Sequence, residues 1–334
     1  MILDNRTLME LTFLGTSAGV PTRHRNVTAL ALQPEQARPW ILVDCGEGTQ
    51  HRLLRCPLSV AKLGLILITH LHGDHCYGLP GLLASRAMAT LAREHQSLTL
   101  IGPKGLKAML EAIMHYSQLS LNFPLEIIEL PEHGGEHHWH NHGIEAIPLK
   151  HNITSFAYQI KEPDFPGSFD KLLAIADGIP EGPVYGRLKQ RDSFVLNDGR
   201  FVNGADYCRP DMPGRTVIIA GDNEQPALLE PYLSNCQLLV HEATYTESVF
   251  NQLTVRVQHS TAASVGSSST KAGLKNLILT HFSPRYANSD KVHDKHSLDE
   301  IRLEAEQYFK NTLFLANDFD QYVLTRKGIL QPKV

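Results

Sequence analysis

Three histidines and one aspartate fall within six consecutive positions of one short segment. The segment is Thr69-His70-Leu71-His72-Gly73-Asp74-His75, and it follows the apolar run 65–68 directly. Alternation along the chain sends His70 and His72 to one side, and the turn at Gly73 redirects the two residues after it. Imidazole and carboxylate groups are typical metal ligands, and their density here favours two metal ions over a polar loop that only caps a strand.

Three later apolar runs each lead to another residue of a metal-binding type. The residues are His151 after 147–149, Asp222 after 217–220 and His281 after 277–280. Taken singly, each histidine could be a hydrogen-bonded core residue, and Asp222 could cap a helix over Glu224–Leu233. Their joint occurrence at the ends of apolar runs favours a role as ligands.

The elements that would position these residues alternate between strand-like and helical patterns, which predicts an α/β protein. A last alternation runs from residue 216 to the end of the chain. Before it, strands are expected over 8–14, 27–32, 40–44, 65–69, 98–102, 125–130, 144–149 and 156–160, and helices over 47–55, 78–94 and 105–116.

Two segments depart from this alternation. Residues 161–215 are crowded with proline and glycine and show little periodicity, so we expect an insertion there. Residues 131–143 read as a polar, glycine-rich loop, and we interpret their histidines as surface residues because no strand end fixes their geometry. Those histidines are His133, His137, His138, His140 and His142.

Composition narrows the class of protein. The chain has 334 residues, 31 Lys or Arg against 35 Asp or Glu, and a net charge of −4, so contact with nucleic acid would depend on local basic patches. Five scattered cysteines without a CxxC pair favour a reducing compartment. No apolar run approaches the ~20 residues that span a bilayer, and residues 1–10 do not resemble a signal peptide. We expect one large cytoplasmic unit, residues 1–334, that is neither secreted nor membrane-spanning.

The HxHxDH segment and the three later ligands resemble the metallo-β-lactamase superfamily. That resemblance implies a four-layer αββα sandwich and two Zn²⁺ per chain, with Mn²⁺ as an alternative. It assigns His70, His72 and His151 to one ion, Asp74, His75 and His281 to the other, and Asp222 to both. Two such ions would outweigh the charge of the two aspartates, which favours an anionic substrate.

Longer motifs resemble those of the ribonuclease Z family in its short bacterial form. They are the Gly-rich segment 14–26, the turn 43–50, the Gly-Pro segment 179–186, the HEAT sequence 241–244 and the HST sequence 259–261. The resemblance implies a zinc-dependent endonuclease that removes the 3′ trailer from precursor tRNA and leaves a 3′-hydroxyl on the tRNA. It also implies a homodimer, and a protruding RNA-binding arm within residues 161–215.

The same resemblance suggests individual roles. Asp74 would orient the attacking water or accept its proton, and His241 would protonate the leaving 3′-oxygen with Glu242 as its partner. The alternative for His241 is a buried, hydrogen-bonded histidine. RNA contacts would come from Arg23, Arg25, Asn26, Ser260, Thr261 and Arg285, and in the arm from Arg187, Lys189 and Arg191.

Three features depart from these patterns. Asn223 stands where the family more often has threonine, and residues 161–215 hold eight Lys or Arg against nine Asp or Glu. The Ser-rich run Ser264–Thr270 lies where a helix is expected although glycine and serine favour helices poorly. Two other readings stay open: a glyoxalase-II-like thioesterase or similar metallohydrolase, and a catalytically silent RNA-binding scaffold.

Overall fold

The computed structural model describes residues 8–34, 39–89, 96–287 and 296–333. They form two compact units: the larger contains the chain up to residue 161 and from 216 onward, and the smaller is Glu162–Arg215. Within the described ranges, no helix is long and apolar enough to cross a membrane.

Eight strands of the larger unit form the first sheet. Its order is β19-β18-β1-β2-β3-β4-β5-β6, and β3 to β6 run parallel to one another. The strands are β1 (Met9–Gly15), β2 (Ala29–Gln33), β3 (Trp40–Val43), β4 (Leu63–Leu67), β5 (Leu98–Pro103), β6 (Leu125–Leu130), β18 (Gln321–Leu324) and β19 (Leu330–Pro332).

Seven strands form the second sheet, in the order β17-β14-β13-β12-β9-β8-β7. Strands β12, β13, β14 and β17 are parallel, so their carboxyl ends meet at one edge. The strands are β7 (Gly135–Trp139), β8 (His142–Leu149), β9 (Ser155–Lys161), β12 (Thr216–Ala220), β13 (Leu238–Glu242), β14 (Asn276–Thr280) and β17 (Thr312–Leu315).

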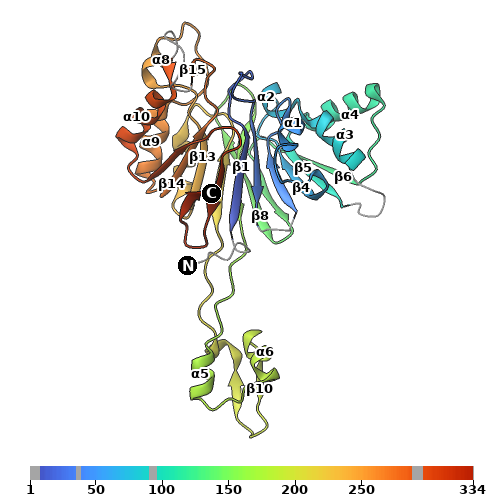
Figure 1. The fold of residues 1–334 in the computed structure, drawn as a ribbon, viewed down its shortest axis with the longest axis vertical. Coiled ribbons are helices and arrows are strands. Elements are labelled where there is room, and N and C mark those ends of the chain that lie inside the picture. Colours follow the sequence, from blue (N-terminus) through green and yellow to red (C-terminus); the bar gives the residue numbers. More distant parts are fainter. Residues whose placement is uncertain (1–7, 35–38, 90–95, 288–295, 334) are drawn as a thin grey trace. The chain divides into compact units, whose positions relative to one another are not determined.

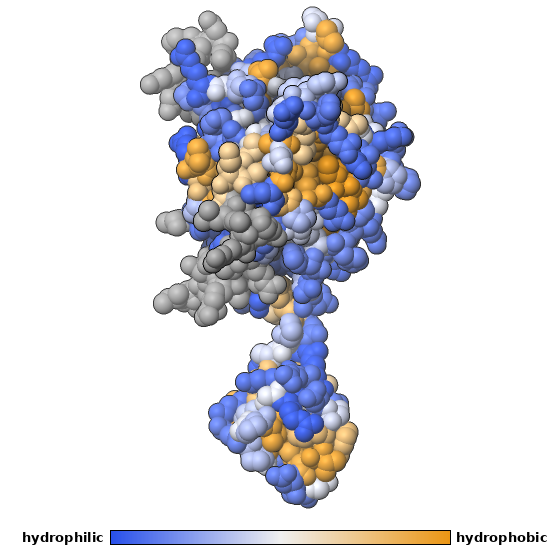
Figure 2. Space-filling view, turned by 90° about the vertical axis from the view of Figure 1, so that its right-hand side faces the viewer, coloured by the Kyte–Doolittle hydropathy of each residue, from blue (hydrophilic) through white to orange (hydrophobic). Residues whose placement is uncertain are grey.

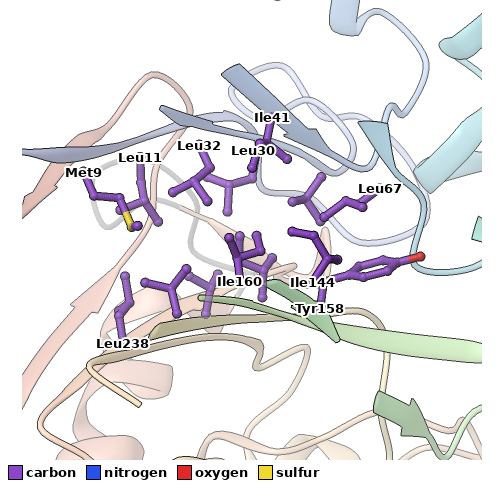
Figure 3. Close-up of a cluster of buried hydrophobic side chains, with 14 of the residues drawn as sticks. Met9, Leu11, Leu30, Leu32, Ile41, Leu67, Ile144, Tyr158, Ile160 and Leu238 are labelled. Carbon is purple, nitrogen blue, oxygen red and sulfur yellow. The ribbon is translucent and has the colours of Figure 1, made fainter. Parts of the chain in front are cut away.

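Apolar side chains from both sheets pack against each other and form the central core. Leu11, Leu32 and Leu67 of the first sheet face Ile144, Ile160 and Leu238 of the second (Figure 3). All six are buried, which supplies the main hydrophobic stabilisation of the sandwich.

Helices cover the outer face of each sheet (Figure 1). The predicted four-layer αββα architecture is therefore confirmed. The first sheet carries α1 (Thr49–Leu53), α2 (Gly73–Cys76), α3 (Leu79–Ala89), α4 (Leu106–Ser117) and the 3-10 turn 60–62, and the second carries α7 (Glu230–Leu233), α8 (Glu247–Asn251), α9 (Ala262–Lys271) and α10 (Leu298–Tyr308). Strands β15 (Tyr286–Ala287) and β16 (His296–Ser297) form a small separate pair.

The smaller unit has a core of its own. Buried side chains that include Tyr185, Leu188 and Phe194 pack together, and Arg215 and Glu162 form a buried ion pair. The stretch shows little periodicity because its helices and strands are short, although they pack together as a unit of their own. They are α5 (Lys171–Ala176), α6 (Pro183–Lys189), β10 (Ser193–Val195), β11 (Phe201–Asn203) and the 3-10 turn 204–207.

Two further expectations need correction. Residues 131–143 are not a loop: β7 pairs with β8 as an antiparallel hairpin at the edge of the second sheet. The segment 224–233 is a 3-10 turn over Pro226–Leu229 followed by the single turn of α7. The helix expected over 78–94 is observed as α3, which ends at Ala89, and residues 90–94 lie outside the described ranges.

The Ser-rich run forms most of α9, despite its poor helix propensity. A Cβ at Gly266 would lie 3.0 Å from the backbone oxygen of Ala305, so α9 and α10 approach each other closely at this point. Thr261 and Ser264 form a capping box at the start of α9. The close packing of α9 and α10 requires small residues at this point. This packing stabilises α9 by more than the poor helix propensity of serine and glycine destabilises it.

Candidate metal centre and active site

The predicted ligands meet where the carboxyl ends of strands from both sheets converge. His70, His72, Asp74 and His75 follow β4 of the first sheet. His151 follows β8, Asp222 follows β12 and His281 follows β14, all in the second sheet. The fold therefore brings together residues up to 211 positions apart along the chain, from His70 to His281.

The first group of donor atoms comprises His70, His72, His151 and Asp222. His70 Nε2 lies 3.1 Å from His72 Nδ1, and His151 Nε2 lies 3.2 Å from the same atom. Asp222 Oδ2 lies 3.6 Å from His70 Nε2 and 3.8 Å from His151 Nε2.

The second group comprises Asp74, His75 and His281. The Nε2 atoms of His75 and His281 are 3.3 Å apart, and Asp74 Oδ2 lies 3.5 Å and 3.4 Å from them, respectively. Asp222 Oδ1 lies 3.4 Å from His75 Nε2 and 3.3 Å from His281 Nε2. The two oxygens of Asp222 thus face the two groups.

Four of the five histidines in these groups have their other ring nitrogen held by an outer partner. Such contacts select one tautomer and fix the direction of the inward-facing lone pair. The contacts are His70 Nδ1 with Thr69 Oγ1 at 3.0 Å, His75 Nδ1 with Asp44 Oδ2 at 2.7 Å, His151 Nδ1 with Gln258 O at 2.8 Å, and His281 Nδ1 with Thr244 Oγ1 at 3.1 Å.

These donors fit divalent zinc. A tetrahedral zinc ion with bonds of about 2.0–2.1 Å holds neighbouring ligand atoms about 3.3–3.4 Å apart. The nitrogen–nitrogen distances within the two groups are 3.1–3.3 Å. Imidazole nitrogens that face one another at this distance, four of the five rings being held by an outer partner, are arranged to share a cation.

Asp44 is a positioning residue to which the sequence analysis gave no role. It follows β3 in a left-handed backbone conformation (φ 60°) and is buried. Its carboxylate accepts hydrogen bonds from the backbone N–H and the hydroxyl of Thr69 and contacts His75 Nδ1. The available signal was a carboxylate at the end of the strand that precedes the HxHxDH strand.

The structure places His241 inside the second sheet, away from any surface. Its side chain is fully buried, Nδ1 lies 2.8 Å from the backbone oxygen of Glu242, and Nε2 lies 3.1 Å from Asn223 Nδ2. Burial lowers the pKa of His241, so its ring is neutral at physiological pH. With both nitrogens engaged, His241 is the buried, hydrogen-bonded histidine of the alternative reading, and this geometry does not support proton donation to a substrate.

His259 lies at the rim of the same cluster instead. Its Nδ1 is 3.1 Å from each carboxylate oxygen of Glu242, and its side chain is 19% exposed whereas Glu242 is 1% exposed. Burial alone would lower the pKa of His259, but the Glu242 carboxylate outweighs that effect and raises it to about 9. Nδ1 is engaged by Glu242, which leaves Nε2 as the atom able to pass a proton outward.

Asn223 and Thr244 connect these groups. The backbone N–H of Asn223 donates to Glu242 at 2.8 Å, and its backbone oxygen accepts from the Ser260 hydroxyl. Thr244 Oγ1 contacts both the Glu242 carboxylate and His281 Nδ1. The HEAT and HST sequences therefore meet at Glu242. Asparagine at position 223 is explained by its amide, which contacts His241.

Several residues expected to bind RNA form hydrogen bonds to other groups of the protein. The Arg25 guanidinium is buried and donates to Thr16 Oγ1, Ala316 O and Asn317 Oδ1. Asn26 donates to Asp318 and to Glu47 O. The hydroxyls of Ser260 and Thr261 bond Asn223 O and the Ser264 N–H. These hydrogen bonds show that the four residues hold loops in place, and their contact with RNA stays a prediction.

The remaining expected contacts are exposed. Arg23 and Arg285 both have exposed side chains in the larger unit. In the smaller unit the Arg187 guanidinium lies over the Phe194 ring, Lys189 Nζ lies 5.8 Å from the Phe169 ring, and Arg191 pairs with Asp211. These last three residues belong to the smaller unit, and their contact with RNA stays a prediction.

Comparison with known proteins supports these observations. Residues 9–171, slightly less than half of the chain, match the family described as "Anti-Pycsar protein Apyc1". Ribonuclease Z of Pseudomonas putida (strain GB-1) is 42% identical over 326 residues, which cover 97% of this chain and 99% of that protein. Ribonuclease Z of Marinobacter nauticus is 41% identical over 320 residues, covering 95% and 97%.

A solved structure agrees with the sequence relatives. Human tRNase Z, short form, superposes with a TM-score of 0.64 at 25% identity and covers 94% of this chain and 98% of that one. The shared sandwich, the ligands gathered at its edge and the identity over nearly the whole length lead to one conclusion: this chain belongs to the ribonuclease Z family, a family of metal-dependent endoribonucleases with the metallo-β-lactamase fold.

Proposed function

We propose that the chain cleaves precursor tRNA endonucleolytically and removes the 3′ trailer, leaving a 3′-hydroxyl on the tRNA and a 5′-phosphate on the trailer. The observation that carries the proposal is the position of the His259–Glu242 pair at the rim of the two ligand groups. His259 Nδ1 lies 3.8 Å from Asp222 Oδ2. Phosphodiester hydrolysis needs a proton for the departing oxygen, and this pair can supply it.

Two metal ions complete the proposed site. His70, His72 and His151 would hold one ion, Asp74, His75 and His281 the other, and Asp222 would contact both, with Zn²⁺ favoured and Mn²⁺ as an alternative. When bound, such a pair polarises a phosphate oxygen and lowers the pKa of a bound water. His259 shares a third group with Asp222 and His281, but its Nδ1 is already engaged by Glu242, so we assign it to proton transfer.

Asp74 is the proposed proton acceptor. Its Oδ2 accepts a 2.7 Å hydrogen bond from the backbone N–H of Gly19, which fixes the carboxylate beside the ligand groups. A water attacks phosphorus and passes its proton toward Asp74, while His259 protonates the departing 3′-oxygen and Glu242 stabilises the protonated ring. This division of labour replaces the expected donor, His241, with His259.

The wider interactions of the enzyme are also proposals. Arg23 and Arg285 would contact phosphates near the scissile bond, and residues 162–215 would form the RNA-binding arm with Arg187, Lys189 and Arg191. Figure 2 shows apolar residues gathered on the face that carries α3 and α4. Met88 of α3 and Tyr116 of α4 are 88% and 86% exposed. That face supports a homodimer. All five cysteines are unpaired, which supports the cytoplasm.

One assay separates the proposed function from its alternatives. Purified protein of measured zinc and manganese content is given an unprocessed tRNA transcript and, separately, a glutathione thioester. We expect cleavage at the junction between tRNA and trailer, with little thioester hydrolysis. Preferential thioester hydrolysis would favour the small-molecule hydrolase, and RNA binding without cleavage by the metal-loaded protein would favour the scaffold.

A further inference from the structure

A cavity of about 730 Å³ in the larger unit has His259 in its wall. Phe250, Leu253, Arg256, Glu224 and Glu247 line it as well. We propose that this cavity binds the base and ribose of the last nucleotide that remains on the tRNA. The proposal rests on the proposed function, because it takes His259 as the donor to the leaving oxygen.

The position of the cavity selects which nucleotide it receives. Cleavage forms a bond between the water oxygen and phosphorus and breaks the bond between phosphorus and the 3′-oxygen, which takes its proton from His259. The ribose that carries this oxygen must therefore lie within hydrogen-bond reach of the His259 ring. A space that has the same ring in its wall is where the remainder of that nucleotide can lie, whereas the trailer extends from the other side of the phosphorus.

The lining fits a base and a ribose better than a second phosphate. Glu224 and Glu247 bring two carboxylates against the single guanidinium of Arg256. Like charge disfavours a phosphate there, but carboxylate oxygens accept hydrogen bonds from ribose hydroxyls and exocyclic amino groups. The volume lies within the range of about 300–1,000 Å³ that is usual for small-ligand sites.

Phe250 supplies the aromatic surface. It lies on α8, its side chain is partly exposed, and Leu253 lies beyond the end of that helix. Bases stack on such rings with little dependence on their identity. Phe250 is therefore the residue expected to contact the base, and tolerance of several bases at this position follows from stacking.

The test is a double-mutant cycle between enzyme and substrate. The substrates are intact precursor tRNA and precursors with one abasic nucleotide, either at the last retained position or at the first trailer position. The enzymes are wild type, Phe250→Ala and Phe250→Leu. The leucine variant keeps apolar bulk without the aromatic ring. Leu303→Ala, an exposed apolar truncation on α10, is the control variant. Metal content and turnover of a nitrophenyl phosphodiester are measured for each enzyme.

We expect the abasic site at the last retained position to lower kcat/KM about tenfold in wild type and in Leu303→Ala. On the intact precursor, kcat/KM of both Phe250 variants should be about tenfold below that of wild type. Removal of the base at the last retained position should lower their kcat/KM little further. Their metal content and nitrophenyl ester turnover should be unchanged. The proposal would be overturned if the abasic site lowered kcat/KM by the same factor in all enzymes. It would also be overturned if the effect of Phe250 depended on the base at the first trailer position instead. If wild type does not cut the junction at all, the proposed function fails instead.

Discussion

The carboxylate of Glu304 on α10 accepts a 2.9 Å hydrogen bond from the backbone N–H of Ala263 at the start of α9. The same carboxylate accepts a 3.0 Å hydrogen bond from the backbone N–H of Glu247 at the start of α8. Helix α9 follows His259 in the chain, and α8 follows Glu242. One side chain thus fixes the spacing of the two loops that carry the proposed proton donor and its partner.

Removal of this link should impair proton donation selectively. We predict that Glu304→Ala lowers kcat for precursor tRNA about tenfold but leaves metal content and nitrophenyl ester hydrolysis nearly unchanged, because nitrophenolate leaves without a proton. Glu306→Ala, an exposed substitution on the same helix, is the control. A parallel loss on both substrates would show a general loss of structure and contradict the prediction.

The two histidines near Glu242 should respond differently to substitution. His259→Ala should lower single-turnover cleavage of precursor tRNA by about 10²–10⁴-fold with metal content unchanged. His241→Ala should chiefly reduce the free energy of unfolding, by about 1–3 kcal/mol, because it leaves buried partners unsatisfied. Denaturant unfolding and cleavage rates are measured on both. A larger catalytic loss in folded, metal-loaded His241→Ala would restore His241 as the donor.

The pH profile should report the same pair. A proton donor must be protonated, so cleavage should be sustained at lower pH and fall as the pH rises through the pKa of His259, about 9. Glu242→Gln removes the carboxylate that raises this pKa, so the alkaline limb should move to lower pH by about one unit or more. Profiles of kcat/KM for wild type, Glu242→Gln and Glu306→Gln test this. If the alkaline limb fell at the same pH in all three enzymes, His259 would be excluded as the proton donor.

Metal occupancy and activity should decrease together when a ligand is lost. We predict about two zinc ions per wild-type chain, and lower occupancy with at least 100-fold lower activity in His72→Ala and His151→Ala. His140→Ala in the β7–β8 hairpin is the control. Elemental analysis after dialysis, before and after chelation, measures the metal. Full activity of chelator-stripped protein with no metal restored would rule out this assignment.

The smaller unit should be removable as a whole. Lys161 and Thr216 are paired neighbours on β9 and β12, so a short Gly-Ser turn can replace residues 162–215 and close a hairpin. This variant should keep zinc and nitrophenyl ester hydrolysis and show a sharply raised KM for precursor tRNA. A shorter deletion within 164–190 is a poorer test, since it would expose the unit's own core. An unchanged KM would show that the unit does not recognise tRNA.

The fold and the convergence of the seven proposed ligands at one edge could be predicted because their signals are local. Strands that are buried on both faces are continuous apolar runs, and the ligands stand directly after such runs. By contrast, nothing local distinguishes His241 from His259 as partners of Glu242. The distinction arises from burial, because β13 buries His241 inside the sheet while the loop before α9 leaves His259 at the rim.

Other differences between the expected and the observed positions have equally specific causes. Arg25 follows a Gly-rich turn like a surface residue, but the distant residues Thr16, Ala316 and Asn317 enclose its guanidinium. Strand β7 is polar because it lies at a sheet edge and has only β8 as a neighbour, so no apolar alternation marks it. Pairings between residues far apart in the sequence decide both cases.

The origin of the ligands in two sheets also affects how each molecule matures during synthesis. The four proposed ligands within residues 70–75 are synthesised about two hundred residues before His281, so a growing chain carries an incomplete set of ligands until His281 has been made. The complete set of ligands forms only after the second sheet has packed on the first. A metal ion that binds after this packing would link the two sheets at their shared edge. Such binding would favour the packed over the unpacked form by mass action. Metal supply would then affect the yield of mature protein as well as its activity.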